Sequence, residues 1–323
     1  MAEIIRLRAP GGVEQLEQVT VDLAPPARGE VRLTQTAIGV NFIDIYQRLG
    51  LYALPPESIP GVEAVGVVAA MGADVTNLKI GDRVAYAGAP VGAYVSDRNL
   101  PAWRCVKLPE SVSDETVASA FLKGITAEML LNRVFPVGGG TTVLVHSAAG
   151  GLGQLLTRWA NVLGAVVIGT VSSQAKAEIA RAAGARHVIV GRDADFVAAI
   201  ADLTSGRGVD VAYDGVGGAT LQKTLGCVRP FGVVASIGQS GGPIPAIDVN
   251  DLGPRRSLML ARPSVMAYAA DAGEYRRSAA RVLEALAGGK LQPTGTAYRL
   301  RDAAQAHADL EAGRTTGALY LKP

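Results

Sequence analysis

A glycine-rich turn between a strand-like run and a helical pattern is the stretch of this chain best suited to chemistry. The turn reads Ala148-x-Gly150-x-x-Gly153, after the β-branched run 142–145 and before apolar residues at helical spacing. Gly150 allows the backbone to approach a pyrophosphate, Gly153 allows the helix to pack on the strand, and the first N–H groups of the helix face the anion. We favour dinucleotide binding over a merely structural turn because the required strand and helix flank the glycines.

The end of the next predicted strand, 165–171, indicates which dinucleotide fits. A protein that binds NAD usually has an Asp or Glu there to hold the ribose 2′-hydroxyl. This chain has Ser172, Ser173 and Lys176 instead, and two hydroxyls with an ammonium suit a 2′-phosphate. The alternative is a serine helix cap followed by a solvated lysine. Because the acidic residue is absent, the sequence predicts NADPH.

Composition and charge exclude several other classes of protein. The 323 residues carry 31 basic and 29 acidic side chains, a formal charge of +2, and the basic residues are dispersed, so there is no electrostatic case for nucleic acid. The N-terminus lacks the pattern of a secretory signal, and apolar runs such as 162–171 are too short to span a bilayer. We expect a cytoplasmic protein that binds neither nucleic acid nor membrane.

Cysteine and histidine are too few and too scattered for a disulfide framework or a metal cluster. The chain has two cysteines, Cys105 and Cys227, and three histidines, His146, His187 and His307, on different predicted elements. The sequence therefore predicts no metal site.

The elements that must position these residues fall into two patterns. Up to about residue 123 the chain reads as short strands between Gly and Pro, which predicts a compact β-barrel-like domain. We expect strands at 30–35, 64–70, 83–87 and 92–95. Between them lies the segment 38–52, whose helical part ends at Gly50. Its Asn41, Tyr46 and Tyr52 could line a pocket with hydrogen-bonding groups or could be ordinary core and surface residues.

From residue 115 onward, helices and strands alternate. This order predicts a doubly wound parallel sheet. We expect helices at 115–135, 173–183, 193–203 and 219–226, and strands at 142–145, 165–171, 187–190, 209–213, 232–237 and 257–261. A helix with Ala279, Val282, Leu283 and Leu286 on one face, a helix at 303–310 and a strand at 318–322 follow. We expect this tail to rejoin the first domain, which leaves the parallel sheet as an insertion.

Seven segments in the same order resemble one known family. They are 37–44 with Tyr46 and Tyr52, 60–66, 81–84, 121–126, 148–153, 213–217 and 262–264. On these motifs the chain resembles zinc-independent members of the medium-chain dehydrogenase/reductase superfamily, among them the bacterial NADPH:quinone oxidoreductases and their animal relative zeta-crystallin. The resemblance implies an α/β fold in which a Rossmann sheet is inserted in a GroES-like β-barrel-type domain. It implies a catalytic domain of residues 1–124 and 265–323, an NADPH-binding domain of residues 125–264, and a homodimer.

The chain departs from the zinc enzymes of that superfamily at the positions that bind metal. Asn41 stands near the position of their zinc-binding cysteine, and Val62 replaces the histidine of their Gly-His-Glu motif. Without a metal, alcohol dehydrogenation loses its usual activation. Hydride delivery to an acceptor that is already electrophilic remains possible.

The resemblance assigns the remaining site residues. It implies Asn41, Tyr46 and Tyr52 beside the nicotinamide and the acceptor, and it implies a cofactor site built from Thr126, Ala149, Gly150, Gly151, Leu152, Gly153, Ser172, Ser173, Lys176, Arg192, Gly238, Gln239, Ser240 and Arg262. Relatives carry an aromatic or histidine ring before the arginine beside the adenosine, whereas this chain has Gly191 before Arg192. Arg314 is displaced by one position from the family's arginine, and we do not assign it to the cofactor.

The predicted function is hydride transfer from NADPH to a small-molecule quinone, with Asn41 and Tyr52 as hydrogen-bond donors to the acceptor oxygen and solvent as the source of the proton. One alternative is a reductase of α,β-unsaturated carbonyls, which must place a proton on carbon. Another is a non-catalytic NADPH-binding or RNA-binding protein of the crystallin type. The near-neutral charge argues against RNA.

Overall fold

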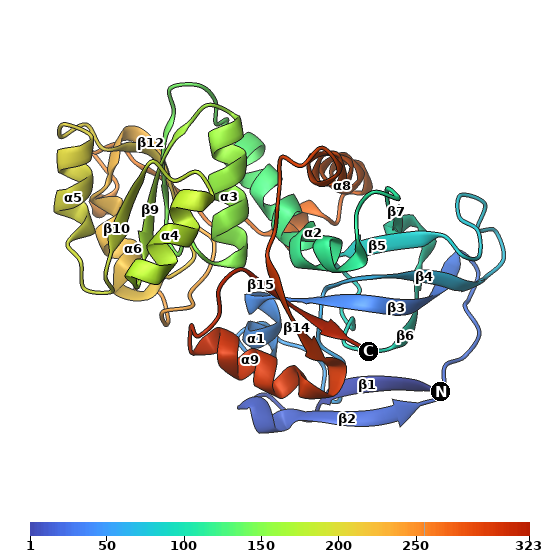
Figure 1. Cartoon of the computed structure of the whole chain (residues 1–323). Coiled ribbons are helices and arrows are strands. Elements are labelled where there is room, and N and C mark those ends of the chain that lie inside the picture. The colour runs from blue at the N-terminus through green and yellow to red at the C-terminus, as the bar shows by residue number, and fades with distance from the viewer. Residues whose placement is uncertain (255) are drawn as a thin grey trace. The chain divides into compact units, whose positions relative to one another are not determined.

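The computed structural model describes residues 1–254 and 256–323 (Figure 1). It divides into two compact units, Met1–Ile125 with Val265–Pro323, and Thr126–Ser264. Each unit has its own sheet and its own apolar core. Within the described residues, no helix is long and apolar enough to cross a membrane.

The second unit is built on a six-stranded parallel sheet. Its strands lie in the order β10-β9-β8-β11-β12-β13. The strand order runs outward from β8 to β10 on one side and from β11 to β13 on the other, so it switches between β8 and β11. All six residues of β11 are buried, as expected for a strand covered by helices on both faces. The strands are β8 Thr142–Val145, β9 Val166–Val171, β10 His187–Val190, β11 Val209–Asp214, β12 Val228–Ser236 and β13 Met259–Ala261.

Helices cover this sheet in the alternation that the sequence predicts. Helices α3 and α4 contact β8, β9 and β10, and α6 contacts β11 and β12. Figure 1 shows α3 to α6 flanking the strands. The helical segments are α3 Gly151–Val162, α4 Gln174–Ala182, α5 Phe196–Leu203, α6 Gly218–Leu225 and the short η4 Val249–Asp251. The predicted Rossmann-type sheet is confirmed.

The first unit contains a mostly antiparallel seven-stranded sheet. Its order is β14-β15-β3-β4-β5-β7, with β6 also paired to β3, and β1 and β2 form a separate pair. Strand β15 lies antiparallel to β3, so the C-terminal segment completes a sheet that the N-terminal segment begins. The strands are β1 Ala2–Leu7, β2 Leu16–Val21, β3 Glu30–Val40, β4 Glu63–Met71, β5 Arg83–Ala87, β6 Asp97–Pro101, β7 Val106–Lys107, β14 Gly295–Arg299 and β15 Ala318–Lys322.

The helices that do not connect strands of the parallel sheet are mostly short. The long ones are α2 and α8, and the boundary between the two units falls inside α2. In Figure 1 the C-terminal α9 lies beside α1, and the two helices are in contact although they stand at opposite ends of the chain. These segments are η1 Val13–Gln15, α1 Phe42–Arg48, η2 Ala102–Arg104, α2 Asp114–Met129, η3 Leu130–Val134, α7 Val265–Tyr268, α8 Ala272–Ala287, η5 Leu300–Asp302 and α9 Ala303–Glu311.

One predicted strand is wrong, and one predicted helix changes its type near its end. The segment 92–95 is not a strand, because Gly92 has a φ of 125° and only Val95 makes an isolated bridge, to Ile4. The strand in this part of the chain is β6, which begins at Asp97 and pairs with β3. The helix predicted to reach Phe135 ends as α-helix at Met129 and continues as a single π-type turn, a local widening that hydrophobic periodicity does not reveal.

Candidate functional site

The glycine turn joins β8 to α3 as the sequence predicts. Gly150 is the N-cap of α3, with extended φ and ψ of −77° and 169° and no side-chain cap on the helix. A Cβ atom at Gly153 would overlap the carbonyl oxygen of Ser147 and lie 2.8 Å from Cα of Ala148. Gly153 therefore lets the helix sit against the turn, and the uncapped N–H groups of α3 are available to an anion.

A buried polar cluster braces the strand ends beneath this turn. The His146 ring lies 2.9 Å from the Thr170 hydroxyl through Nδ1 and 2.9 Å from the Thr224 hydroxyl through Nε2. Asp214 accepts hydrogen bonds from Val216 N and from the Thr224 hydroxyl, 2.8 and 2.9 Å away. Burial lowers the pKa of His146, which keeps the ring neutral at neutral pH. The cluster ties β8, β9, β11 and α6 together at the carboxyl edge of the sheet.

Two further loops reach the same edge. Ser240 donates its hydroxyl to the Gly215 carbonyl oxygen over 3.1 Å, so the loop after β12 is fixed to the loop after β11. Arg262, which follows β13, is exposed and donates to the Ser236 hydroxyl over 2.7 Å. The carboxyl end of a parallel sheet beside its switch in strand order is where ligands bind in such folds. Nine of the cofactor candidates lie along this edge: Ala149, Gly150, Gly151, Leu152, Gly153, Gly238, Gln239, Ser240 and Arg262. Thr126, the first residue of this unit, lies in α2 instead.

Lys176 and Arg192 lie close enough together for their charges to interact. Burial, and next the positive charge of Arg192, lower the pKa of Lys176. Ser173 is the N-cap of α4 and accepts from Lys176 N over 3.4 Å, as the structural alternative expected, while its neighbour Ser172 is half-buried. Two cations that repel each other beside hydroxyl groups and a helix N-terminus form a site that an anion would stabilise.

Asn41 in the first unit lies between two buried carboxyl groups. Its side-chain amide donates to Glu63 Oε1 over 2.8 Å, and its backbone N–H donates to Asp44 Oδ2 over 2.9 Å. Glu63 Oε2 also accepts from Leu122 N over 2.7 Å, and Glu63 lies 3.5 Å from the ammonium of Lys123. Asn41 is thus held rigidly, and its amide group has a second N–H hydrogen available for a ligand.

The two candidate tyrosines lie in and just after α1. Their rings meet edge to face, with centroids 5.6 Å apart. Tyr46 is buried, whereas Tyr52 is 44 % exposed and its backbone N–H bonds to the Tyr46 carbonyl oxygen. An exposed ring contributes little to a core, so Tyr52 is free to contact a ligand while Tyr46 supports it.

The residues that support Asn41 are not apparent from the sequence alone. Glu63 and Asp44 both stand inside the quoted motifs 60–66 and 37–44, so the signal was present. Their role depends on pairing between β3 and β4 and on burial, because each carboxyl group is nearly fully enclosed. In the ranges 1–254 and 256–323, no group of three or more His, Cys, Asp or Glu side chains could hold a metal ion.

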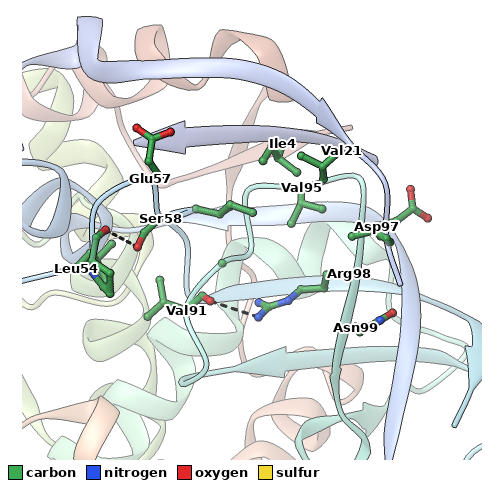
Figure 2. A pocket seen from close by; sticks show the side chains of 14 residues that line it. Ile4, Val21, Leu54, Glu57, Ser58, Val91, Val95, Asp97, Arg98 and Asn99 are labelled. Carbon is green, nitrogen blue, oxygen red and sulfur yellow. Dashed lines mark hydrogen bonds between the residues drawn. The ribbon is translucent and has the colours of Figure 1, made fainter. Parts of the chain in front are cut away.

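A groove elsewhere in the first unit contains none of the predicted residues. Figure 2 shows its apolar side, with Ile4, Val21 and Val95, and the Arg98 side chain reaching toward Val91. Arg98 donates to the carbonyl oxygens of Pro90 and Val91 and to the Tyr86 hydroxyl. These contacts already occupy its guanidinium, so we assign the groove no ligand.

Comparison with known proteins identifies the class to which this fold belongs. Residues 27–110 match the model of the alcohol dehydrogenase GroES-like domain, and residues 151–284 match that of zinc-binding dehydrogenases. The chain is 39 % identical to a quinone oxidoreductase of Pseudomonas aeruginosa, over all of both chains. It is also 39 % identical to a 2-haloacrylate reductase of a Burkholderia species, over all of this chain and 99 % of the relative. The structure of Escherichia coli quinone oxidoreductase complexed with NADPH superposes with a TM-score of 0.96 at 37 % identity, covering both chains fully.

The two-domain architecture, a GroES-like unit with an inserted Rossmann unit, is that of the medium-chain dehydrogenases/reductases. Within that superfamily, the chain belongs to the quinone oxidoreductase family. The predicted family is confirmed.

Proposed function

We propose that this protein is an NADPH-dependent oxidoreductase that transfers hydride to a quinone without a metal. The observation that carries the proposal is the pair of cations, Lys176 and Arg192, beside a dinucleotide turn, where an NAD-binding protein would carry an acid. The relatives named quinone oxidoreductase, one of them solved with NADPH, support it. The predicted cytoplasmic location and the absence of nucleic-acid and membrane partners remain predictions.

The residues present fit NADPH. Space around Gly150 admits a pyrophosphate, since a Cβ there would meet only the Ser147 carbonyl oxygen, at 3.3 Å, and Lys176 with Arg192 suits the 2′-phosphate. When bound, this cofactor supplies the hydride. We assign the 2′-phosphate to Ser172, Ser173, Lys176 and Arg192, and the rest of the cofactor to Thr126, the glycine turn, Gly238, Gln239, Ser240 and Arg262.

The acceptor residues act by hydrogen bonding. The free N–H of Asn41 and the Tyr52 hydroxyl would donate to the acceptor oxygen as negative charge develops on it. Glu63 keeps Asn41 in a fixed orientation, so this donor needs no reorganisation during the reaction. Water supplies the proton that completes a hydroquinone. In this scheme residues 1–124 and 265–323 form the catalytic domain and residues 125–264 the cofactor domain.

A reductase of activated alkenes is the second candidate. The 2-haloacrylate reductase, as similar to this chain as the quinone oxidoreductase of Pseudomonas aeruginosa, favours it. Such a reaction delivers hydride to one carbon and a proton to its neighbour, so it requires a proton donor near the alkene.

One experiment tests both candidates. NADPH oxidation by the purified protein would be followed with a panel of benzoquinones and naphthoquinones and a panel of enones and haloacrylates, with and without a metal chelator. We expect quinones to be reduced equally well with chelator. Turnover of alkenes alone would support the second candidate, and activity that disappears with chelator and returns with zinc would refute the metal-free reaction.

Tyr52→Phe is expected to lower quinone turnover without changing stability. The substitution removes a hydroxyl from a half-exposed ring and opens no cavity, so the melting temperature and NADPH affinity should hardly change. Losing one hydrogen bond to the developing oxyanion should slow turnover by about tenfold or more. Steady-state rates with 1,4-benzoquinone measure this. Unchanged rates would remove Tyr52 from the site.

We also propose a homodimer that forms through β13, the edge strand of the parallel sheet. Met259 and Leu260 are 51 % and 36 % exposed, and an apolar edge strand readily pairs with a second copy. Light scattering at micromolar concentration should therefore give twice the chain mass. Leu260→Glu should yield monomers, whereas Val162→Glu, at an exposed apolar residue on α3, should not. A monomeric wild-type protein would contradict the proposal.

A further inference from the structure

A buried chain of hydrogen bonds begins and ends on α1. Arg48, the last residue of the helix, donates from Nε to His307 Nδ1 over 3.3 Å. His307 Nε2 lies 2.9 Å from the Tyr94 hydroxyl, which donates to Asp44 Oδ2 over 3.0 Å. All four side chains are at most 1 % exposed. This hydrogen-bond chain thus starts on α1, passes through His307 on α9 and Tyr94 in the loop before β6, and returns to α1.

The donor directions in this chain follow from its chemistry. An arginine can only donate, so His307 Nδ1 accepts and the ring proton is on Nε2. Nε2–H then donates to the Tyr94 oxygen, and the Tyr94 proton is directed at Asp44. Burial, and next the charge of Arg48, lower the pKa of His307 to about 3, so this ring stays neutral and the direction is kept. The other end of the Arg48 guanidinium is fixed by the Gly11 carbonyl oxygen and by Glu311.

Asp44 is hydrogen-bonded directly to Asn41, the candidate donor to the substrate oxygen. Its Oδ2 accepts both from Tyr94 and from the backbone N–H of Asn41, whereas its buried Oδ1 has no hydrogen-bond partner. A buried carboxylate oxygen without a donor is unfavourable, and a proton on Oδ1 removes the charge. Asn41 is therefore fixed by two carboxyl groups, one of which can change its charge.

We propose that Asp44 is a positioning residue for acceptor reduction: it holds the Asn41 backbone directly, is itself held by the hydrogen-bond chain, and slows the reaction when it loses its proton. The inference rests on the proposed function of Asn41 as the donor to the acceptor oxygen. Hydride transfer places negative charge on that oxygen, so a carboxylate buried behind Asn41 opposes the reaction and a neutral carboxyl group does not. Unit charges about 10 Å apart in an effective dielectric near 20 change a rate by roughly tenfold, the effect we expect.

Burial, offset in part by the groups around Asp44, places the change at neutral pH. Burial raises the pKa of Asp44 to about 7, with a smaller contribution from Glu63 on β4. The backbone N–H of Asn41, the Tyr94 hydroxyl and Lys123 on α2 act in the opposite direction. The His307 ring on α9 is neutral, and the guanidinium of Arg48 is paired with Glu311.

The test compares Asp44→Asn and Tyr94→Phe with wild type. At saturating NADPH, kcat/KM for a quinone should fall about tenfold as the pH rises through 7 in the wild type. It should not fall in Asp44→Asn, whose neutral amide imitates the protonated acid. In Tyr94→Phe the fall should move to higher pH, because the carboxylate loses a donor. Tyr86→Phe, which removes another buried tyrosine hydroxyl outside the chain, should keep the wild-type midpoint.

A readout independent of catalysis separates this inference from the proposed function. The infrared carbonyl band of a protonated carboxyl group should titrate near pH 7 in the wild type and be missing in Asp44→Asn. If the protein reduces no acceptor but shows this band, the result refutes the proposed function and leaves the titration of Asp44 standing. A missing band, or a fall in kcat/KM that persists in Asp44→Asn, would overturn the role of Asp44.

Discussion

In cofactor titrations, Lys176→Glu is expected to bind NADPH more weakly than wild type by at least about tenfold, with NADH affinity little changed. A charge-assisted hydrogen bond to phosphate contributes roughly 1.5–3 kcal/mol, and about 1.4 kcal/mol corresponds to tenfold in affinity. Lys176 is half-buried and close to Arg192, so the replacement removes one of two cations and adds a repelling carboxylate. Fluorescence titration with both cofactors measures the difference.

The structure offers a matched control for this substitution. Arg181→Glu makes the same change in net charge on the same helix, at an exposed residue that pairs with Glu178. It should leave NADPH affinity unchanged. Folding should not complicate the comparison, because a Glu in the first turn of α4 is favourable there and the Ser173 cap uses only the Lys176 backbone. Equal weakening of both cofactors by Lys176→Glu would refute its assignment to the 2′-phosphate.

Gly153→Ala is expected to lower the free energy of unfolding by about 3 kcal/mol, the upper part of the range for overpacking. The added Cβ would overlap the Ser147 carbonyl oxygen and come within 2.8 Å and 3.0 Å of Cα and C of Ala148. All three are backbone atoms of the turn and cannot rotate away. Helix α3 must therefore move off the strand end, which also disturbs the N–H groups that face the cofactor. Urea unfolding and NADPH titration measure the two effects.

Gly150→Ala separates the two glycine roles. The backbone at Gly150 is extended and the nearest atom to an added Cβ is 3.3 Å away, so the free energy of unfolding should change by no more than about 1 kcal/mol, the scale of an N-cap substitution. The methyl group would still occupy the space that a pyrophosphate needs. We expect NADPH affinity to fall while the protein stays folded. A Gly153→Ala variant as stable as Gly150→Ala would show that close packing of α3 is not the reason for Gly153.

The sequence by itself determined the inserted parallel sheet and the glycine turn. It also showed that Lys176 and Arg192 stand where an NAD-binding protein would have a carboxylate. Each is a local property: a strand, a turn and a helix lie within a few tens of residues, and hydrophobic periodicity follows burial directly. The same local reasoning failed at 92–95, where the backbone of Gly92 takes a φ of 125° and extended pairing is lost. It predicted the helix up to residue 135 but not the π-type turn of η3 at its end.

Only the tertiary structure decided what surrounds Asn41. Glu63 reaches it across the pairing of β3 with β4, and the Asp44 chain depends on Tyr94 and His307, which are 213 residues apart in sequence. No periodicity links such residues, because their proximity follows from β15 pairing with β3 and α9 packing beside α1. The charge state of Asp44 is likewise set by burial, a property of the whole folded unit rather than of any segment.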